Sequence, residues 1–226
     1  MINIVKSQPA PLCLSVEKEK NNGDYKCGEV LERIQNDFHN KCYICEDKDI
    51  TSINVEHFEP HQNNKEKLFD WNNLFYACQH CINIKNDLEK YHPLLNCTNE
   101  NHKILDWIKF EYEIMPLGEP KIIALQTDEL TQKTVTLIQD VFTGTTPLKT
   151  LEARNLRRKL EKEMRPFLND LFEYFSDDTF SEEEKTILKL RIIRRLSIKS
   201  AFTAFKVWYI NKNSVYLQEF SQYLPS

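Results

Sequence analysis

Residues 42–81 read CYICEDKDITSINVEHFEPHQNNKEKLFDWNNLFYACQHC and contain two Cys-x-x-Cys pairs, Cys42/Cys45 and Cys78/Cys81. A pair with this spacing turns two thiolates toward one point, and two pairs complete the tetrahedral ligand set of a Zn²⁺ ion. One pair alone is also typical of a redox dithiol, whereas two pairs favour structural zinc. We therefore predict that this region folds around a zinc ion held by these four cysteines.

The cysteine count also bears on the cellular compartment. The chain has seven cysteines, and an odd count without a recognisable secretion signal argues against a disulfide framework and favours a reducing cytoplasm. The three cysteines outside the pairs, Cys13, Cys27 and Cys97, are expected to be buried thiols. The sequence has no apolar run near the ~20 residues that span a bilayer, so we expect a cytoplasmic protein without membrane contact.

The segment between the two pairs is longer than a simple zinc ribbon requires, with 32 residues between Cys45 and Cys78. Ile53 and Val55 predict a short strand, residues 62–67 are polar and loop-like, and residues 74–77 form a short apolar run. A helix is expected after Cys81 as far as residue 90. The insert therefore has the predicted order strand, loop, strand and helix, with a cysteine pair at each end.

The insert carries side chains suited to phosphodiester hydrolysis. That reaction needs an activated water, stabilised charge on the phosphate and a stabilised leaving oxygen. His57 has the pKa range of a general base, and the adjacent Glu56 can hold a divalent metal. Asn73 can hold the imidazole in its working tautomer, and Asn83 on the following helix can supply a second metal ligand.

These motifs, Cys-x-x-Cys, Glu-His-x-x-Pro, Trp-x-Asn-Leu, Cys-x-x-Cys and Asn-x-Lys, together resemble the HNH endonuclease family, whose site is a ββα-metal fold. The resemblance implies that His57 is the general base, that Glu56 binds a catalytic Mg²⁺ or Mn²⁺, and that Asn73 orients the base. The family usually has His or Asn directly after the last cysteine. Because Ile82 stands there, the second ligand is assigned to Asn83, with Asp87 as the alternative.

A wider resemblance covers residues 24–226 in general layout. The sequence around Phe58-Glu59-Pro60 and Trp71, with its helical tail, is similar to the HNH nuclease subunit of Septu-type anti-phage defence systems, including retron-associated ones. It implies an ABC/SMC-like ATPase partner and, in retron systems, a reverse transcriptase with multicopy single-stranded DNA. DNA is the family's usual substrate, and structured RNA such as tRNA is an alternative. A non-catalytic zinc-stapled adaptor that docks to an ATPase, or a stand-alone restriction-like nuclease, remains open.

The rest of the chain predicts an α+β protein in two parts, residues 1–97 with the HNH core and residues 98–226 with a β-hairpin and a helical lobe. A helix is expected over residues 24–39, capped by Asn22 or Asp24. The other expected elements are a hairpin over residues 107–114 and 121–125, a helix from Asp128 to Gly144, a helix from residue 150 with a kink or break at Pro166, and a helix from Ser181 toward Trp208.

Charge is unevenly distributed along the chain, which has a net charge of -4. Residues 1–150 carry a net -7 and residues 151–226 a net +3, with seven of the eight arginines in the second stretch. Arginine pairs well with phosphate and carboxylate groups, so the second stretch is a candidate docking or polyanion surface; solvated helix faces are the alternative. The overall acidity predicts weak nucleic-acid binding by the chain alone, and therefore substrate delivery by a partner.

Overall fold

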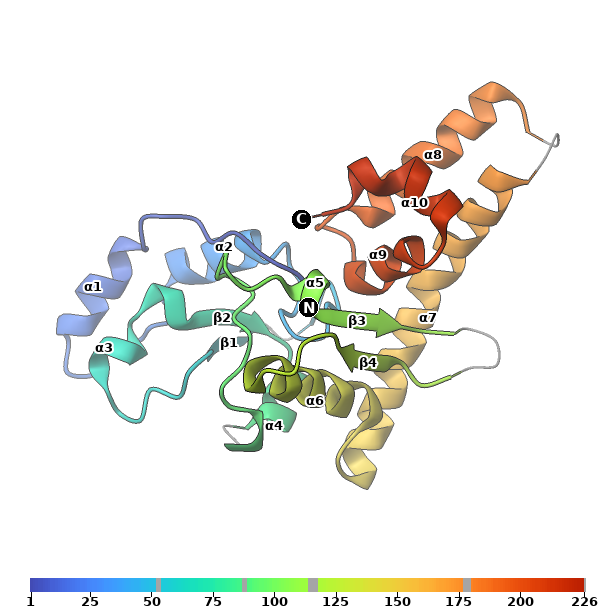
Figure 1. Ribbon diagram of the computed structural model, residues 1–226. Coiled ribbons are helices and arrows are strands. Elements are labelled where there is room, and N and C mark those ends of the chain that lie inside the picture. The colour runs from blue at the N-terminus through green and yellow to red at the C-terminus, as the bar shows by residue number, and fades with distance from the viewer. Residues whose placement is uncertain (52–53, 87–88, 114–117, 177–179, 226) are drawn as a thin grey trace.

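The computed structural model describes residues 1–51, 54–86, 89–113, 118–176 and 180–225. The described chain is mainly helical and contains two small antiparallel sheets (Figure 1). The strands are β1 (Asn54–His57), β2 (Leu74–Ala77), β3 (Ile108–Glu111) and β4 (Lys121–Ala124). The helices are α1 (Leu12–Glu19), α2 (Gly28–Asp37), α3 (Lys65–Leu68), α4 (Gln79–Lys85), α5 (Ile104–Trp107), α6 (Glu129–Thr143), α7 (Pro147–Phe175), α8 (Glu182–Leu196), α9 (Thr203–Asn211) and α10 (Ser214–Phe220).

The first sheet and α4 form the part of the fold between the cysteine pairs. β1 pairs antiparallel with β2, with Glu56 opposite Phe75 and His57 opposite Leu74. Every residue of β2 is buried, and α4 begins directly after Cys78. The predicted order strand, loop, strand and helix is confirmed for the described residues. Two details differ, because the loop contains the short helix α3 and α4 ends at Lys85 rather than at residue 90.

The N-terminal helices show that two predictions were wrong. Cys13 and Cys27 form a disulfide, with their Cα atoms 6.4 Å apart, so they are not free thiols. The connection between α1 and α2 folds back and brings them together, which a cysteine count cannot show. Cys27 is also the residue before α2, whose first turn has no side-chain cap from Asn22 or Asp24. Because disulfides are typical of oxidising compartments, the cysteine pattern no longer supports a reducing one.

The second sheet lies between two helices of the C-terminal half. β3 packs against α9, and β4 packs against α6 (Figure 1). The ring of Phe205 lies 5.4 Å from that of Phe110 and 5.3 Å from that of Phe142, so one aromatic side chain of α9 closes the core beneath the sheet. The predicted bounds of α6 are confirmed, since the Asp128 side chain caps its start and Gly144 follows its end at φ 86°.

The long helices α7 and α8 form an antiparallel arm (Figure 1). α7 continues through Pro166, so of the predicted kink or break the break does not occur; Met164 and Phe167 on either side are buried and hold the helix in place. The capping box at Ser181 is confirmed. α8 ends at Leu196 instead of continuing toward Trp208. Within the described residues, no helix is both long and apolar enough to cross a bilayer.

The early end of α8 is explained by the buried carboxylate of Glu46, which lies in the loop over residues 46–49 after the first cysteine pair, called here the first cysteine loop. The Glu46 carbonyl oxygen and side chain accept hydrogen bonds from the backbone N–H groups of Phe202 and Thr203, which fixes the turn before α9. Glu46 also accepts from Lys41 at 3.3 Å and from the Met1 ammonium at 2.8 Å. Burial alone raises the pKa of Glu46, but the two cations outweigh it and lower that pKa to about 2. The ion pairs and hydrogen bonds of Glu46 therefore connect the first cysteine loop to the helical lobe.

Candidate functional site

The four paired cysteines converge in the structure. Their Sγ atoms all lie within 4.8 Å of one another, all four side chains are buried, and the Sγ atoms of Cys45 and Cys78 are 3.9 Å apart. A tetrahedron with Zn–S bonds of about 2.3 Å has edges of about 3.8 Å. Among the described residues, this is the one group of His, Cys, Asp and Glu side chains that is arranged for a metal. The predicted cluster is therefore present and is compatible with zinc.

The electrostatics of the cluster also favour a bound cation. Burial raises the pKa of Cys45 and of Cys81 well above the usual value for a thiol. Hydrogen bonds from the neighbouring thiols, that of Cys42 first, lower the pKa of Cys78. Four buried thiols this close together cannot all ionise unless a cation compensates the charge, and soft thiolate ligands select zinc. The backbone N–H of Asp47 donates to the Cys45 sulfur at 3.4 Å and supports the first pair.

A second site lies at the end of β1, in a pocket of about 280 Å³. Its walls come from β1, from the loop that follows it, from α4 and from the segment before α2. The lining residues are Tyr25, Lys26, Asn54, Val55, Glu56, His57, Pro60, His61, Gln79, Ile82, Lys85 and Asn86. The pocket therefore contains the predicted base and the predicted acidic ligand side by side.

The imidazole of His57 is held in a defined orientation. Its Nε2 lies 3.0 Å from the carbonyl oxygen of Leu68. Because a carbonyl oxygen only accepts hydrogen bonds, Nε2 carries the proton in the neutral ring, and Nδ1 is then the basic nitrogen. The centroid of the Tyr25 ring lies 4.6 Å from that of the His57 ring, and the centroid of the His61 ring lies 4.7 Å from it, both in an edge-to-face arrangement.

Asn73 supports His57 through the intervening loop. The Asn73 side-chain oxygen accepts from the backbone N–H of Glu59 at 2.7 Å, and its nitrogen donates to the carbonyl oxygens of Glu59 and Lys67 at 3.0 and 3.2 Å. Lys67 directly precedes Leu68, whose carbonyl holds the imidazole. Asn73 was predicted to contact the ring itself, whereas the structure places its amide on the segment that positions the ring.

Glu56 is buried, and one of its two oxygens is already engaged. Tyr43 donates its hydroxyl proton to Oε1, and the Lys85 ammonium lies 3.2 Å from the same oxygen. Burial raises the pKa of Glu56, although the charge of Lys85 opposes this effect. Among the described residues, no donor binds Oε2. Glu56 therefore lines the pocket with a carboxylate whose Oε1 is held by two donors.

Lys85 is a site residue whose role sequence reasoning missed. From the sequence we assigned this lysine no role, but its side chain is buried. Besides Glu56, its ammonium donates to the carbonyl oxygens of His57 and Phe58 at 3.0 and 2.9 Å. One lysine of α4 therefore holds the end of β1 in place. The Asn-x-Lys motif was the available signal, since Lys85 lies one turn after Cys81 on the same helix face.

The structure describes one of the two candidates for a second metal ligand. Asn83 is exposed, lies outside the pocket lining and accepts a hydrogen bond from Gln79 at 2.6 Å. Asp87 lies outside the described residues. Ile82 faces the pocket, and Asn86, four positions later on the same face, lines it too. Asn83 is one helical turn from both Gln79 and Asn86, which line the pocket, but its own side chain is bonded to Gln79 and is not part of the lining.

Comparison with protein-family models and with curated proteins found no match. The resemblance to the HNH family therefore rests on the sequence motifs.

His80, which lies between the cysteines of the second pair, has a connecting role. Its Nδ1 lies 2.7 Å from the Glu152 carboxylate on α7, and its Nε2 lies 2.8 Å from the carbonyl oxygen of Val141 on α6. Both ring nitrogens are thus directed to other helices rather than to the sulfur cluster. His80 ties α4, and with it one wall of the pocket, to the helical half of the molecule.

Substitution of Lys85 by Ala is expected to destabilise the protein by about 3–5 kcal/mol, because it leaves the Glu56 carboxylate buried without its cation. The free energy of unfolding measured in urea tests this expectation. The double variant Lys85→Met/Glu56→Gln removes both charges and should recover at least half of the loss. Equal losses in the single and double variants would show that the ion pair is not the source of the effect.

Proposed function

We propose that this protein is a metal-dependent HNH endonuclease that hydrolyses nucleic-acid phosphodiesters. One observation carries the proposal: Glu56 and His57 at the end of β1 share a pocket with α4, and the same hairpin and helix are joined at their other end by the four-cysteine cluster. This is the order of elements and residues that the motif resemblance implies for a ββα-metal site.

In this proposal His57 is the general base. The Leu68 carbonyl keeps the proton on Nε2, so Nδ1 takes the proton from the attacking water. Asn73 keeps Leu68 in place through Lys67, and Lys85 fixes the backbone at His57. A positioned base of this kind typically contributes ~10²–10⁴-fold to the rate.

The pocket also fits a catalytic divalent cation. Mg²⁺ is usually bound by one or two carboxylates, waters and a substrate phosphate rather than by an all-protein cage. Glu56 would hold the ion through Oε2, and the amide of Asn86 lines the same pocket. When bound, Mg²⁺ or Mn²⁺ would stabilise charge on the phosphate and on the leaving oxygen. Zinc in the cysteine cluster would have no open coordination position, so its role would be structural.

The substrate and partners follow from the chemistry and from the resemblance. A water nucleophile does not need a 2′-hydroxyl, so both DNA and structured RNA such as tRNA are substrates compatible with this site. We propose an anti-phage effector role with an ABC/SMC-like ATPase as partner, since the Septu-like layout implies one. A reverse transcriptase with its multicopy single-stranded DNA is the further partner in a retron-associated system.

One observation favours a second candidate function, a non-catalytic adaptor that docks to an ATPase. Ile82 occupies the helix position where the family supplies a metal ligand, and Lys85 already neutralises Glu56. A protein that had lost its chemistry would have this apolar substitution and this internal ion pair. The two candidates differ in whether the pocket turns over substrate.

Sequencing of DNA and RNA ends in cells that express the chain together with the proposed ATPase partner tests the proposal. New ends with a 5′ phosphate are expected, and they should be absent when His57→Ala replaces the native chain. Identical ends in both cells would favour the adaptor. Copurification with the ATPase tests the partner separately, because a free chain that cuts plasmid DNA at full rate would indicate a stand-alone nuclease.

A further inference from the structure

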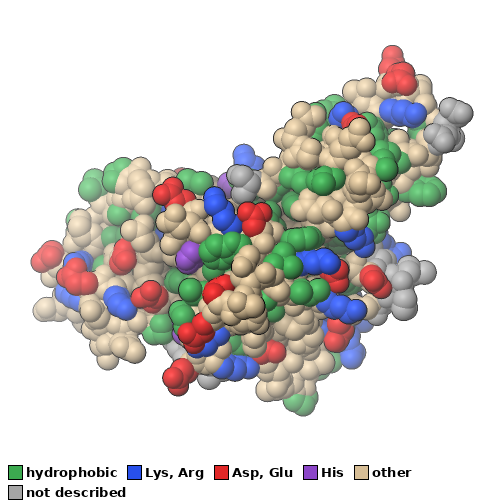
Figure 2. Space-filling view, in the orientation of Figure 1, with side chains coloured by type: hydrophobic (Ala, Val, Ile, Leu, Met, Phe, Trp, Pro, Cys, Tyr) green, Lys and Arg blue, Asp and Glu red, His purple; other side chains and the backbone are tan. Residues whose placement is uncertain are grey.

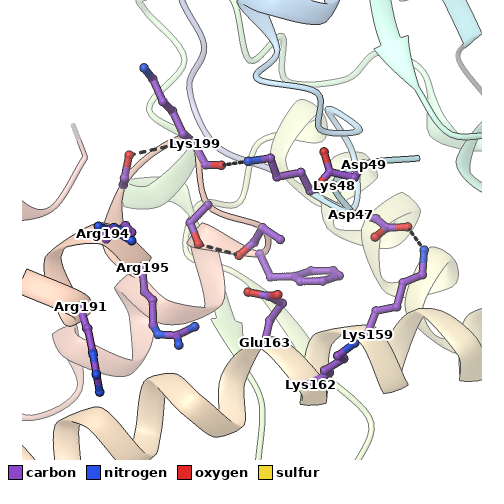
Figure 3. A pocket seen from close by; sticks show the side chains of 14 residues that line it. Asp47, Lys48, Asp49, Lys159, Lys162, Glu163, Arg191, Arg194, Arg195 and Lys199 are labelled. Carbon is purple, nitrogen blue, oxygen red and sulfur yellow. Dashed lines mark hydrogen bonds and ion pairs between the residues drawn. The ribbon is translucent and has the colours of Figure 1, made fainter. Parts of the chain in front are cut away.

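A larger cleft of about 880 Å³ lies away from the β1 pocket, where the first cysteine loop meets the arm (Figure 3). Its walls are α7, the last turns of α8, the turn over residues 197–202 and the loop over residues 47–49. The charged side chains that line it are Asp47, Lys48, Asp49, Lys159, Lys162, Glu163, Arg191, Arg194, Arg195 and Lys199. Figure 3 shows Arg195 directed toward α7, with Arg191 and Arg194 beside it and the side chain of Lys199 extending away from them.

The charge of the cleft is opposite to that of the chain. Seven cations and three carboxylates line it, although the whole protein carries a net charge of -4. On the face shown in Figure 2, by contrast, acidic and basic side chains are interspersed over the part that contains α1 and α3. A concave surface lined by one sign of charge concentrates the electric field and attracts ligands of the other sign.

The three carboxylates of the cleft already have partners. Asp47 pairs with Lys159 at 2.6 Å, and Glu163 lies 3.4 Å from Lys206, a buried lysine beside the cleft. Asp49 accepts a hydrogen bond from Asn40 at 2.6 Å. These carboxylates therefore neutralise only part of the positive charge.

Several cations, in contrast, have no carboxylate of their own. Within the part of the chain that the structure describes, no carboxylate lies at ion-pair distance from Lys162, Arg194 or Lys199. Arg191 and Arg195 share the single carboxylate of Asp170, at 3.9 and 3.0 Å. The cleft therefore holds more positive charge than its protein surroundings compensate.

We infer that this cleft binds two or more adjacent phosphate groups, the chemistry that a nucleic-acid strand and a nucleoside polyphosphate share. The cations come from α7, from α8 and from two loops, so one small anion would not reach all of them. Guanidinium groups bind phosphate oxygens in a bidentate manner, and three arginines line the cleft. The volume also lies within the ~300–1,000 Å³ typical of ligand pockets.

From the sequence, all of residues 151–226, with their seven arginines, are a candidate polyanion surface. The inference restricts that surface to the cleft, which three of these arginines line. Arg157 faces another direction, where it lies 3.6 Å from Glu119, and Arg165 pairs with Glu161 along α7. If the ligand is a nucleic-acid strand, the inference rests on the proposed function and deepens it, because it names where the substrate is held away from the reacting phosphate. For a nucleoside polyphosphate, it stands without that function.

The double variant Lys162→Gln/Arg194→Gln tests the inference, in a His57→Ala background without added divalent cation so that hydrolysis does not interfere. Fluorescence anisotropy is measured with a short single-stranded oligonucleotide and, separately, with a fluorescent nucleoside triphosphate. We expect the double variant to weaken binding of at least one probe by about tenfold. For the oligonucleotide, the slope of log affinity against log salt should fall by about 1.4, since each lost contact contributes about 0.7.

The matched control is Arg154→Gln/Arg158→Gln, which removes the same charge from exposed positions on α7 outside the cleft lining. A loss confined to the cleft variant supports the inference, and the probe that is affected identifies the ligand. Binding of neither probe, or equal losses in cleft and control variants, overturns it. Because the assay does not depend on turnover, a failed cleavage experiment leaves this result unchanged, and failure here leaves the cleavage experiment unchanged.

Discussion

His57→Ala is expected to lower the rate of phosphodiester cleavage by about 10²–10⁴-fold, which is the contribution of a positioned general base. The substitution removes the imidazole whose Nε2 is held by the Leu68 carbonyl, and with it the Nδ1 atom that is proposed to take the proton. Stability should change little, because the side chain lines a pocket and its hydrogen bond to the Leu68 carbonyl is worth about 1 kcal/mol. Initial rates at saturating substrate and the urea midpoint provide the two measurements.

The matched control for this prediction is His61→Ala. His61 lines the same pocket and its ring packs on that of His57, but it follows the strand rather than ending it. We expect a loss of about tenfold or less, since a ring that only packs on the base affects its orientation and not the proton transfer. Full activity in His57→Ala, or equal losses in the two variants, would exclude His57 as the base and favour the adaptor.

Removal of the cysteine-cluster metal is expected to unfold the protein. Structural zinc contributes apparent binding free energies of about 10–16 kcal/mol at neutral pH, whereas whole domains are stable by about 5–15 kcal/mol. Metal analysis should find one zinc per chain, and a strong chelator should abolish the cooperative unfolding transition seen by circular dichroism. Cys78→Ser should have the same effect, since Cys78 is both a cluster ligand and the residue before α4.

Cys97→Ala is the control for the cysteine variants. Cys97 is also buried, and burial raises its pKa to about 12, but it lies outside the cluster. This variant should keep its zinc and lose about 1 kcal/mol of stability, which is typical of a small truncation in a core. A folded Cys78→Ser protein, or a native protein without zinc, would contradict the structural role of the metal.

The expected effect of metal removal is large because both the β1 pocket and the cleft depend on the cysteine cluster. The second cysteine pair starts α4, which carries Lys85 and Asn86 to the β1 pocket. The first pair is followed by the loop that carries Lys48 to the cleft and Glu46 to the start of α9. Loss of the cluster is therefore expected to abolish cleavage and phosphate binding together, whereas variants of either site should affect one function only.

The sequence by itself determined the local features of this protein. The spacing of Cys42, Cys45, Cys78 and Cys81 predicted their cluster, and the strand, loop, strand and helix between them followed from short apolar runs. The adjacency of Glu56 and His57 placed both at the end of one strand. These features depend on neighbours within a few residues, and such spacings translate directly into a shared strand or helix face.

Only the tertiary structure decided which groups meet between elements. The pairing of Cys13 with Cys27, the end of α8 at Leu196 and the contact of Asn73 with the loop that positions His57 each join segments that no local spacing relates. A buried cation such as Lys85 needs hydrogen-bond acceptors, and these come from the end of β1 and from Phe58, the residue after it. The 880 Å³ cleft likewise depends on contacts between distant segments, because Glu46 accepts hydrogen bonds from the α8–α9 turn and Lys48 donates to the carbonyl oxygen of Lys199.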